Sequence, residues 1–188
     1  MGWTVIFIDG EYLRKIFDKV GLRNDVPKVV NEILELSNTN EKKLLRVYYY
    51  TSSPYQSSTP SEDEKERYKS FQKFEAFLKK QNNFEIKLGR IEKRGDEFEQ
   101  KMVDVLLSID LVELSTKSNI DTAILVAGDS DLVPAAKKAK FNGVKVILIY
   151  PSDKSEYHEE LWVTADKRIL IDYKSMKKCS YYQPQSPK

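Results

Sequence analysis

Cysteine and histidine are almost absent from this chain of 188 residues, which has one of each, Cys179 and His158. One cysteine forms no disulfide within the chain, and neither a cysteine cluster nor a multi-histidine site for zinc can be built. We therefore expect any metal site to use oxygen ligands. We also expect a cytoplasmic protein, since structural disulfides are rare in that compartment.

Long apolar runs and a strong charge of one sign are also lacking. No stretch approaches the roughly 20 apolar residues of a membrane-spanning helix. The net charge of +2 gives no argument for nucleic acid from bulk electrostatics. A glycine-rich phosphate-binding loop is missing too, which argues against dinucleotide-binding and P-loop enzymes. With 40% hydrophobic and 32% charged residues, the chain has the composition of one ordinary globular domain.

Short apolar runs alternate with segments of helical periodicity along most of the chain. Continuous apolar or β-rich runs predict strands, and apolar residues spaced three and four apart predict helices. The predicted strands are 3–8, 44–51, 84–88, 122–127, 144–150 and 168–171, and the predicted helices are 11–20, 26–36, 62–80, 101–114, 132–141 and 156–163. This alternation indicates an α/β fold, with a mainly parallel sheet covered by helices on both faces.

Two segments fall outside this alternation. Residues 89–99 are polar and basic, and we expect a hairpin around Arg94-Gly95-Asp96. Residues 173–188 contain two prolines and several lysines, and we expect a flexible basic tail. The folded domain is therefore predicted to be residues 1–172.

Four aspartates lie next to predicted strand ends or at the start of a predicted helix. Asp9 ends the first strand, Asp129 and Asp131 follow the strand at 122–127, and Asp104 lies in the first turn of the helix at 101–114. Carboxyl ends of parallel strands share one edge of the sheet, where ligands bind. We therefore expect the four carboxylates to meet there. Such an oxygen-rich site suits Mg²⁺ or Mn²⁺.

Each of these aspartates also has a structural interpretation. Asp9 can bind backbone amides in the turn before Gly10, and Asp129 or Asp131 can cap the following helix. Asp104 is favoured by the helix dipole. Independent capping does not require that all four meet at one edge, so the pattern favours a metal site.

Two further acidic residues receive structural interpretations. Asp110 lies six residues after Asp104 and points toward the apolar side of its helix, so we expect a buried, hydrogen-bonded residue. Glu11 is close to Asp9 but begins a helix, and we expect it to be solvated.

Three blocks of sequence, in order, carry a family resemblance. The first is Val5-Ile6-Phe7-Ile8-Asp9-Gly10-Glu11-Tyr12-Leu13, and the second is Lys101-Met102-Val103-Asp104-Val105, with Asp110 after it. The third is Ile124-Leu125-Val126-Ala127-Gly128-Asp129-Ser130-Asp131-Leu132-Val133-Pro134, followed by Gly143-Val144-Lys145-Val146. Together they resemble the NYN domain, the LabA-like branch of the PIN-like nuclease superfamily.

The resemblance implies a Rossmann-like three-layer sandwich of the PIN-like type and an acidic pocket for Mg²⁺ or Mn²⁺. It implies a metal-dependent ribonuclease whose partner is nucleic acid, with no membrane association and with a homodimer as a common assembly. Carried over by position, the implied catalytic and metal-binding residues are Asp9, Asp104, Asp129 and Asp131.

This chain departs from the family pattern at two positions. Tyr12 stands where an Asn is common, so a polar contact beside the metal is missing or altered. Met102 replaces the usual Gly, which would narrow the approach of the backbone to a phosphate. Neither change removes an acidic ligand.

Candidate substrate contacts are Ser130, Lys101, Arg90 and Arg94. Ser130 begins a predicted helix, where a hydroxyl and backbone amides can bind a phosphate. The three basic residues are equally well explained as solvated surface charge.

Competing classes of function fit less well. A haloacid-dehalogenase phosphatase requires Asp-x-Asp after the first strand, where this chain has Asp9-Gly10-Glu11. A Toprim domain would match Asp129-Ser130-Asp131, but it needs a glutamate after an early strand, where Asp9 stands. A non-catalytic module that binds RNA or protein and retains the acidic pocket is the main alternative to a nuclease.

Overall fold

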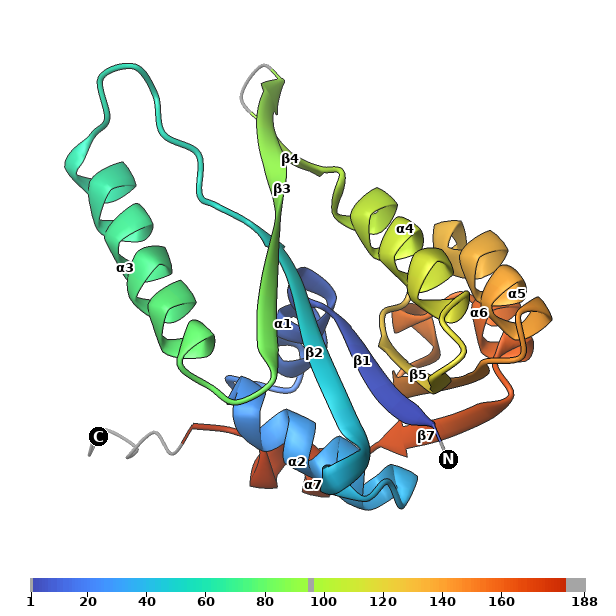
Figure 1. Ribbon diagram of the computed structural model, residues 1–188. Coiled ribbons are helices and arrows are strands. Elements are labelled where there is room, and N and C mark those ends of the chain that lie inside the picture. The colour runs from blue at the N-terminus through green and yellow to red at the C-terminus, as the bar shows by residue number, and fades with distance from the viewer. Residues whose placement is uncertain (1, 95–96, 182–188) are drawn as a thin grey trace.

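The computed structural model of the chain contains one sheet of seven strands, in the order β4-β3-β2-β1-β5-β6-β7 (Figure 1). It describes residues 2–94 and 97–181, with residues 92–94 and 97–101 described by their backbone alone. The strands are β1 (Trp3–Asp9), β2 (Leu44–Ser52), β3 (Phe84–Arg94), β4 (Glu97–Lys101), β5 (Ile120–Val126), β6 (Lys145–Pro151) and β7 (Lys167–Ile171). Neighbours from β3 across to β7 pair in parallel, and β4 pairs with β3 in antiparallel fashion.

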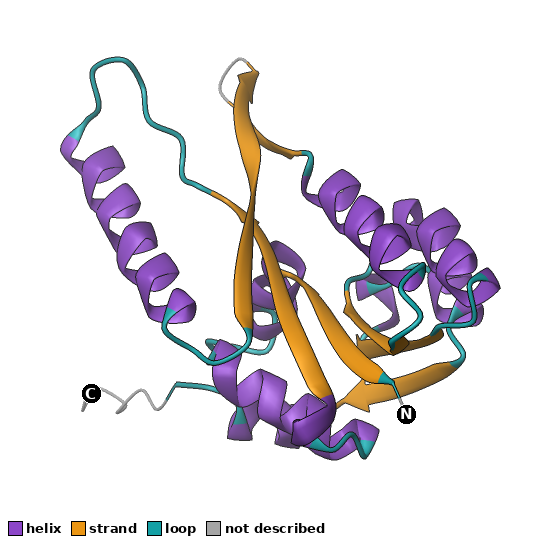
Figure 2. Ribbon diagram, in the orientation of Figure 1, coloured by secondary structure: helices purple, strands orange, loops and turns teal. Residues whose placement is uncertain are grey.

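Helices cover both faces of this sheet (Figure 2). They are α1 (Gly10–Asp18), α2 (Val26–Ser37), α3 (Glu62–Lys79), α4 (Val103–Ser115), α5 (Val133–Phe141), α6 (Glu159–Thr164) and α7 (Tyr173–Lys178), with 3₁₀ turns η1 (Glu41–Lys43), η2 (Ser130–Leu132) and η3 (Lys154–Glu156). The predicted α/β sandwich with a mainly parallel sheet is therefore confirmed.

The central strand β1 is buried on both faces, which explains its continuous apolar run. Ile6 and Ile8 belong to a core cluster with α1, α2 and α7. Val5 and Phe7 belong to the opposite cluster, with α4, α5 and α6. Parallel strands are typically apolar on both faces for this reason. The same arrangement places the carboxyl ends of β1 and β5 side by side at one edge of the sheet.

Two chain segments differ from the sequence expectation or extend it. The predicted hairpin is present: β3 and β4 pair from Arg90 with Lys101 to Arg94 with Glu97, and Gly95 and Asp96 at its tip lie outside the described residues. Pairing with β4 extends β3 past the predicted end at residue 88, so that the hairpin projects beyond the neighbouring strands (Figure 2).

The first part of the predicted flexible tail is structured. Residues 173–178 form α7, whose Met176 is buried, and Cys179 after it is buried as well. Asp172 begins this helix by accepting a hydrogen bond from the Ser175 amide at 2.8 Å. Residues 182–188 lie outside the described residues. None of the described helices is long and apolar enough to cross a membrane.

Candidate active site

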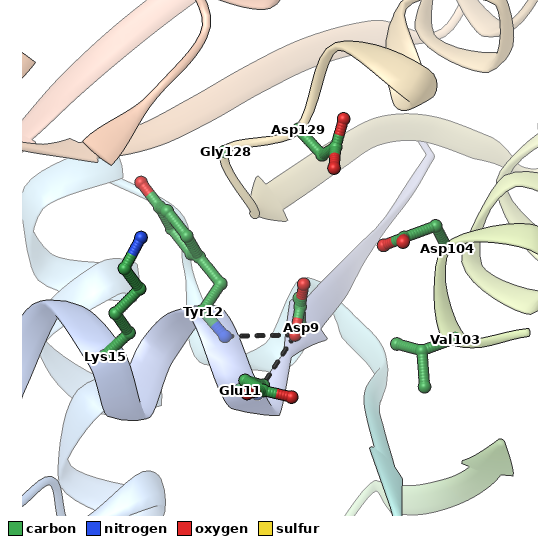
Figure 3. Close-up of a pocket in the computed structure, with 8 residues that line it drawn as sticks. All are labelled: Asp9, Glu11, Tyr12, Lys15, Val103, Asp104, Gly128 and Asp129. Atoms are coloured by element: carbon green, nitrogen blue, oxygen red, sulfur yellow. Dashed lines mark hydrogen bonds between the residues drawn. The ribbon is translucent and has the colours of Figure 1, made fainter. Parts of the chain in front are cut away.

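An acidic cavity of about 360 Å³ opens at the carboxyl ends of β1 and β5 (Figure 3). It is lined by Asp9, Glu11, Tyr12, Lys15, Val103, Asp104, Gly128 and Asp129. Tyr12 and Lys15 come from α1, whereas Val103 and Asp104 begin α4 on the other side of the cavity (Figure 3). The topology thus brings together three of the four predicted aspartates, which are far apart in the sequence.

Asp9 ends β1 and caps α1. Its Oδ1 accepts hydrogen bonds from the amides of Glu11 at 3.0 Å and Tyr12 at 3.1 Å, drawn as dashed lines in Figure 3. Within the described part of the chain, Oδ2 of Asp9 accepts no hydrogen bond. The capping interpretation is therefore correct for one oxygen, and the second oxygen has no hydrogen-bond donor among the described residues.

Asp129 follows the same pattern at the end of β5. Its Oδ1 accepts a hydrogen bond from the Asp131 amide at 2.9 Å and another from Ser130 Oγ at 3.4 Å, and so caps η2. Oδ2 of Asp129 accepts none from the residues that the structure describes. Asp129 is exposed, so a ligand from solvent can approach this oxygen.

Gly128 lies between the end of β5 and Asp129, and its lack of a side chain allows Asp129 to reach the cavity. A Cβ atom at this position would lie 2.4 Å from the Glu156 carbonyl oxygen and 2.5 Å from the ring of Tyr12. Contacts this short are not tolerated, so only glycine allows the chain to pass between these two groups.

The carboxylates of the cavity disfavour one another's charge. Burial raises the pKa of Asp9 to about 6, and the charge of Asp104 contributes in the same direction. Burial also raises the pKa of Asp104, followed by the charges of Asp129 and Asp131. Desolvation and like charge both favour the neutral acid, and a bound cation would reverse both effects.

Asp131 has a different position from the other three predicted residues. It is exposed and does not line the cavity, although its charge is felt at Asp104. The structure therefore separates an inner set, Asp9, Asp104 and Asp129, from one outer carboxylate.

The donor chemistry of the cavity fits a hard divalent cation. The acidic lining residues supply carboxylate oxygens, the donors that suit Mg²⁺ and Mn²⁺, and neither cysteine nor histidine is among the lining residues. Among the described residues, no group of three or more His, Cys, Asp or Glu side chains is close enough to hold a metal ion as it stands. The three carboxylates thus surround one space without converging on a point.

Sequence reasoning missed part of the lining. Glu11 is exposed, as expected, and also lines the cavity, and so does Lys15, whose Nζ lies 3.1 Å from Glu156 Oε2. Tyr12 is buried, and its hydroxyl finds no hydrogen-bond partner among the described residues. Burial raises the pKa of Tyr12, with the charge of Glu156 as the next cause. Positions 11 and 12 lie about one helical turn before position 15, which was the signal available for this face of α1.

The predicted substrate contacts are spread more widely. Ser130 lies beside Asp129, and Arg90 is an exposed residue of β3 opposite Lys101. The side chains of Lys101 and Arg94 lie outside the described residues. Neither Ser130 nor Arg90 lines the acidic cavity.

Asp110 is a hydrogen-bonded residue of α4, as its position in the sequence predicts, and it is half-buried where a buried residue was expected. Its Oδ2 accepts a hydrogen bond from the Tyr50 hydroxyl at 2.8 Å, and Lys87 Nζ lies 3.7 Å away. It links α4 to β2 and β3 and does not line the acidic cavity.

Met102, one of the two departures from the resembled pattern, has a left-handed backbone. Its φ of 73° and ψ of −6° lie in the region that glycine adopts without strain, and its side chain is exposed. The backbone thus explains why glycine is usual at this position.

Comparison with known proteins gives one family match. The model of the NYN domain matches residues 4–172. The chain is also similar to Uncharacterized protein MJ0482 of Methanocaldococcus jannaschii, with 49% identity over 47 residues. That alignment covers 25% of this chain and 20% of the relative, so it spans one fifth of the relative's length. No solved structure matches the chain.

Proposed function

Because the chain belongs to the NYN domain family, we propose that it is a metal-dependent nuclease that hydrolyses phosphodiester bonds of RNA. The observation that carries this proposal is that Asp9, Asp104 and Asp129 line the same cavity, at the carboxyl ends of the parallel strands. These strand ends are where α/β folds bind their ligands.

The proposed ligands of Mg²⁺ or Mn²⁺ are Asp9 and Asp129. Each of them uses Oδ1 to cap the following helix or turn, which fixes its carboxylate and directs Oδ2 to a cation. When bound, such a cation lowers the pKa of water and stabilises negative charge on the leaving oxygen. Because capping holds both carboxylates in place, little side-chain freedom is lost on binding.

Asp104 and Asp131 are proposed to orient the attacking water. Asp104 lies in the cavity beside the proposed ligands, so its carboxylate can accept a hydrogen bond from the attacking water. Asp131 lies outside the lining and acts on Asp104 through its charge.

Lys15 and Ser130 are the proposed phosphate contacts nearest to the aspartates. Lys15 lines the cavity and is 63% exposed, so its ammonium group can move from Glu156 to an incoming phosphate. Ser130 is the residue next to Asp129. Arg90, Arg94 and Lys101 on the hairpin remain proposed contacts for more distant phosphates of the RNA.

The proposal is tested by cleavage of generic single-stranded and structured RNA with and without Mn²⁺. Asp9→Asn and Asp129→Asn are the variants of choice because asparagine also caps helices and should leave the fold intact. Asp121→Asn is the matched control, since Asp121 lies on β5 but at the opposite edge of the sheet, where it accepts a hydrogen bond from Gly2.

We expect Mn²⁺-dependent cleavage by the wild type and by Asp121→Asn, and a loss of at least about 100-fold in Asp9→Asn and Asp129→Asn. Cleavage that survives in both site variants would overturn the site. RNA binding by the wild type without cleavage of any substrate would instead favour a non-catalytic module. The homodimer implied by the family resemblance stays a prediction, which light scattering after size-exclusion chromatography measures.

A further inference from the structure

A second cavity, of about 500 Å³, lies beside the acidic one. Glu11 lines both cavities, and Gly10, which also lines the second, directly follows Asp9. Its wall is built from α1, the carboxyl end of β2, the loop after β2, and α3. The complete lining is Gly10, Glu11, Arg14, Asn24, Tyr49, Thr51, Ser52, Pro54, Tyr55, Arg67, Phe74 and Ile91.

Aromatic side chains form part of the wall of this second cavity, with Phe74 half-buried and Tyr49 5% exposed. The rings of Tyr49 and Phe74 meet edge to face, with centroids 5.6 Å apart and planes at 70°. Tyr49 also packs on Gly10, where a Cβ atom would lie 2.6 Å from the tyrosine hydroxyl. The charge of Asp9 is one of the causes that raise the pKa of Tyr49, after burial, which shows how near this wall is to the acidic cavity.

Two buried polar atoms of the same cavity have no partner. Ser52 Oγ and Asn24 Nδ2 make no hydrogen bond within residues 2–94 and 97–181, and Ser52 is only 9% exposed. Buried donors and acceptors are normally paired, because an unpaired one retains the cost of losing water. The two unpaired atoms therefore indicate that this cavity binds a ligand, or ordered water that a ligand displaces.

Positive charge lies at the cavity as well. Arg14, 61% exposed in its side chain, and the exposed Arg67 both line it, and Arg14 is bound to Asp18 at 2.7 Å. Guanidinium groups are suited to phosphate. The second cavity therefore combines aromatic side chains, two unpaired polar atoms and two guanidinium groups suited to phosphate.

We propose that the second cavity binds one base of the RNA strand whose scissile phosphate lies at the acidic cavity. This inference rests on the proposed nuclease function and adds a subsite to it. A nucleobase has flat apolar faces that stack on aromatic rings and an edge of hydrogen-bonding groups. A purely apolar ligand would leave Ser52 and Asn24 unpaired, and an anion alone would not use the aromatic wall.

The chemistry also indicates which edge is recognised. Asn24 Nδ2 donates, and Ser52 Oγ donates or accepts, so the matching edge carries at least one carbonyl or ring-nitrogen acceptor. Base preference is expected to depend on Ser52, whereas Arg67 is expected to strengthen binding of every sequence.

The test is RNA binding in EDTA, so that neither metal nor cleavage enters the result. Fluorescently labelled hexamers of A, C, G and U are titrated by anisotropy, with the four ribonucleoside 5′-monophosphates as competitors. The variants are Ser52→Ala and Arg67→Gln, and the controls are Ser70→Ala and Lys73→Gln, which alter exposed residues of α3 that do not line the cavity.

We expect one hexamer to bind at least about five-fold tighter than the weakest, and Ser52→Ala to reduce this preference to about two-fold or less. The thermal midpoint of Ser52→Ala should equal or exceed that of the wild type, because the hydroxyl has no partner to lose. Arg67→Gln should weaken all hexamers about equally, and the controls should change nothing.

Three results would overturn the inference: no base preference in the wild type, a preference unchanged by Ser52→Ala, or binding of monophosphates but not of hexamers, which would identify a site for free nucleotides. Because the test needs no turnover, its failure is separate from a failure of the nuclease assay. A protein that cleaves RNA without base preference would retain the acidic site and lose the second one.

Discussion

At the scale of single residues, Asp9 and Asp129 combine an observed capping role with the proposed metal-binding role. Oδ1 of Asp9 holds the first turn of α1, and its second oxygen is left in a crowded, acidic cavity. Capping and metal binding are therefore compatible functions of one side chain. The cost of this arrangement falls on the metal-free protein, in which burial raises the pKa of Asp9 to about 6.

This cost predicts a pH-dependent stability difference. Below pH about 4, Asp9 is protonated in the folded and in the unfolded protein, and its burial costs little. As the pH rises from about 4 to about 6, Asp9 loses its proton in the unfolded chain first, so the free energy of unfolding falls. In EDTA at pH 8, Asp9→Asn should be more stable than the wild type by about 1–3 kcal/mol. Urea unfolding at pH 4 and pH 8 measures this difference, and an equal gain at both pH values would contradict it.

A second residue-scale prediction concerns Met102. A side chain at φ 73° is strained by roughly 1–2 kcal/mol, whereas glycine is not. Glycine gives the unfolded chain more conformational entropy, which offsets part of the relieved strain. Met102→Gly should therefore stabilise the protein by about 0.5–1 kcal/mol. Met102→Ala retains the strain and should give no gain in thermal or urea unfolding. A gain from alanine equal to that from glycine would assign the effect to the exposed methionine side chain instead.

At the scale of secondary structure, the elements buried on both faces were predictable, and the peripheral ones were predictable only in part. The runs of β1 and β5 are apolar because each packs against helices on both sides, and sequence shows this directly. The outer half of β3 is polar because it pairs with β4 beyond the main sheet. α7 has six residues and three lysines, so its helical structure depends on tertiary contacts that no local pattern contains.

Some residues of the candidate site could likewise be predicted from the sequence, and others could not. Asp9 and Asp129 could be found because strand ends of a parallel sheet share an edge. Glu11 and Lys15 depend on which face of α1 turns toward the cavity. The second cavity depends on how α3 packs beside β2 and β3, which sequence periodicity does not specify.

The packing of α7 against the core can be tested by mutation. Met176 is 2% exposed and belongs to the core cluster of α1 and α2. Met176→Ala should therefore destabilise the protein by about 2–4 kcal/mol, as for other buried methionines. Tyr173→Ala, on the same helix but 56% exposed, should change the free energy of unfolding by less than about 0.5 kcal/mol. Equal effects of the two in urea unfolding would show that α7 is not packed as described.

At the scale of the whole molecule, one sheet with a core cluster on each face should unfold as a single cooperative unit. A cation that binds only the folded state raises the midpoint of this unfolding. We expect Mn²⁺ at about 100 times its dissociation constant to stabilise the wild type by about 2.7 kcal/mol.

Thermal unfolding with Mn²⁺ and with EDTA measures this gain. Asp129→Asn should reduce it strongly, and Asp121→Asn should retain it. A gain that is the same in all three proteins would mean that Mn²⁺ binds outside the acidic cavity.

The adjacency of β1 and β5 has a consequence for how such a site can change over evolutionary time. Neighbouring strands lie about 4.8 Å apart because the length of the peptide hydrogen bond fixes that interval. Asp9 and Asp129 extend from the ends of two such neighbours. The spacing of the two strand ends is thus fixed by the backbone, whereas the position of Asp129 also depends on Gly128, which connects it to β5. Substitutions elsewhere in the lining can therefore change the charge of the cavity without moving the strand ends apart.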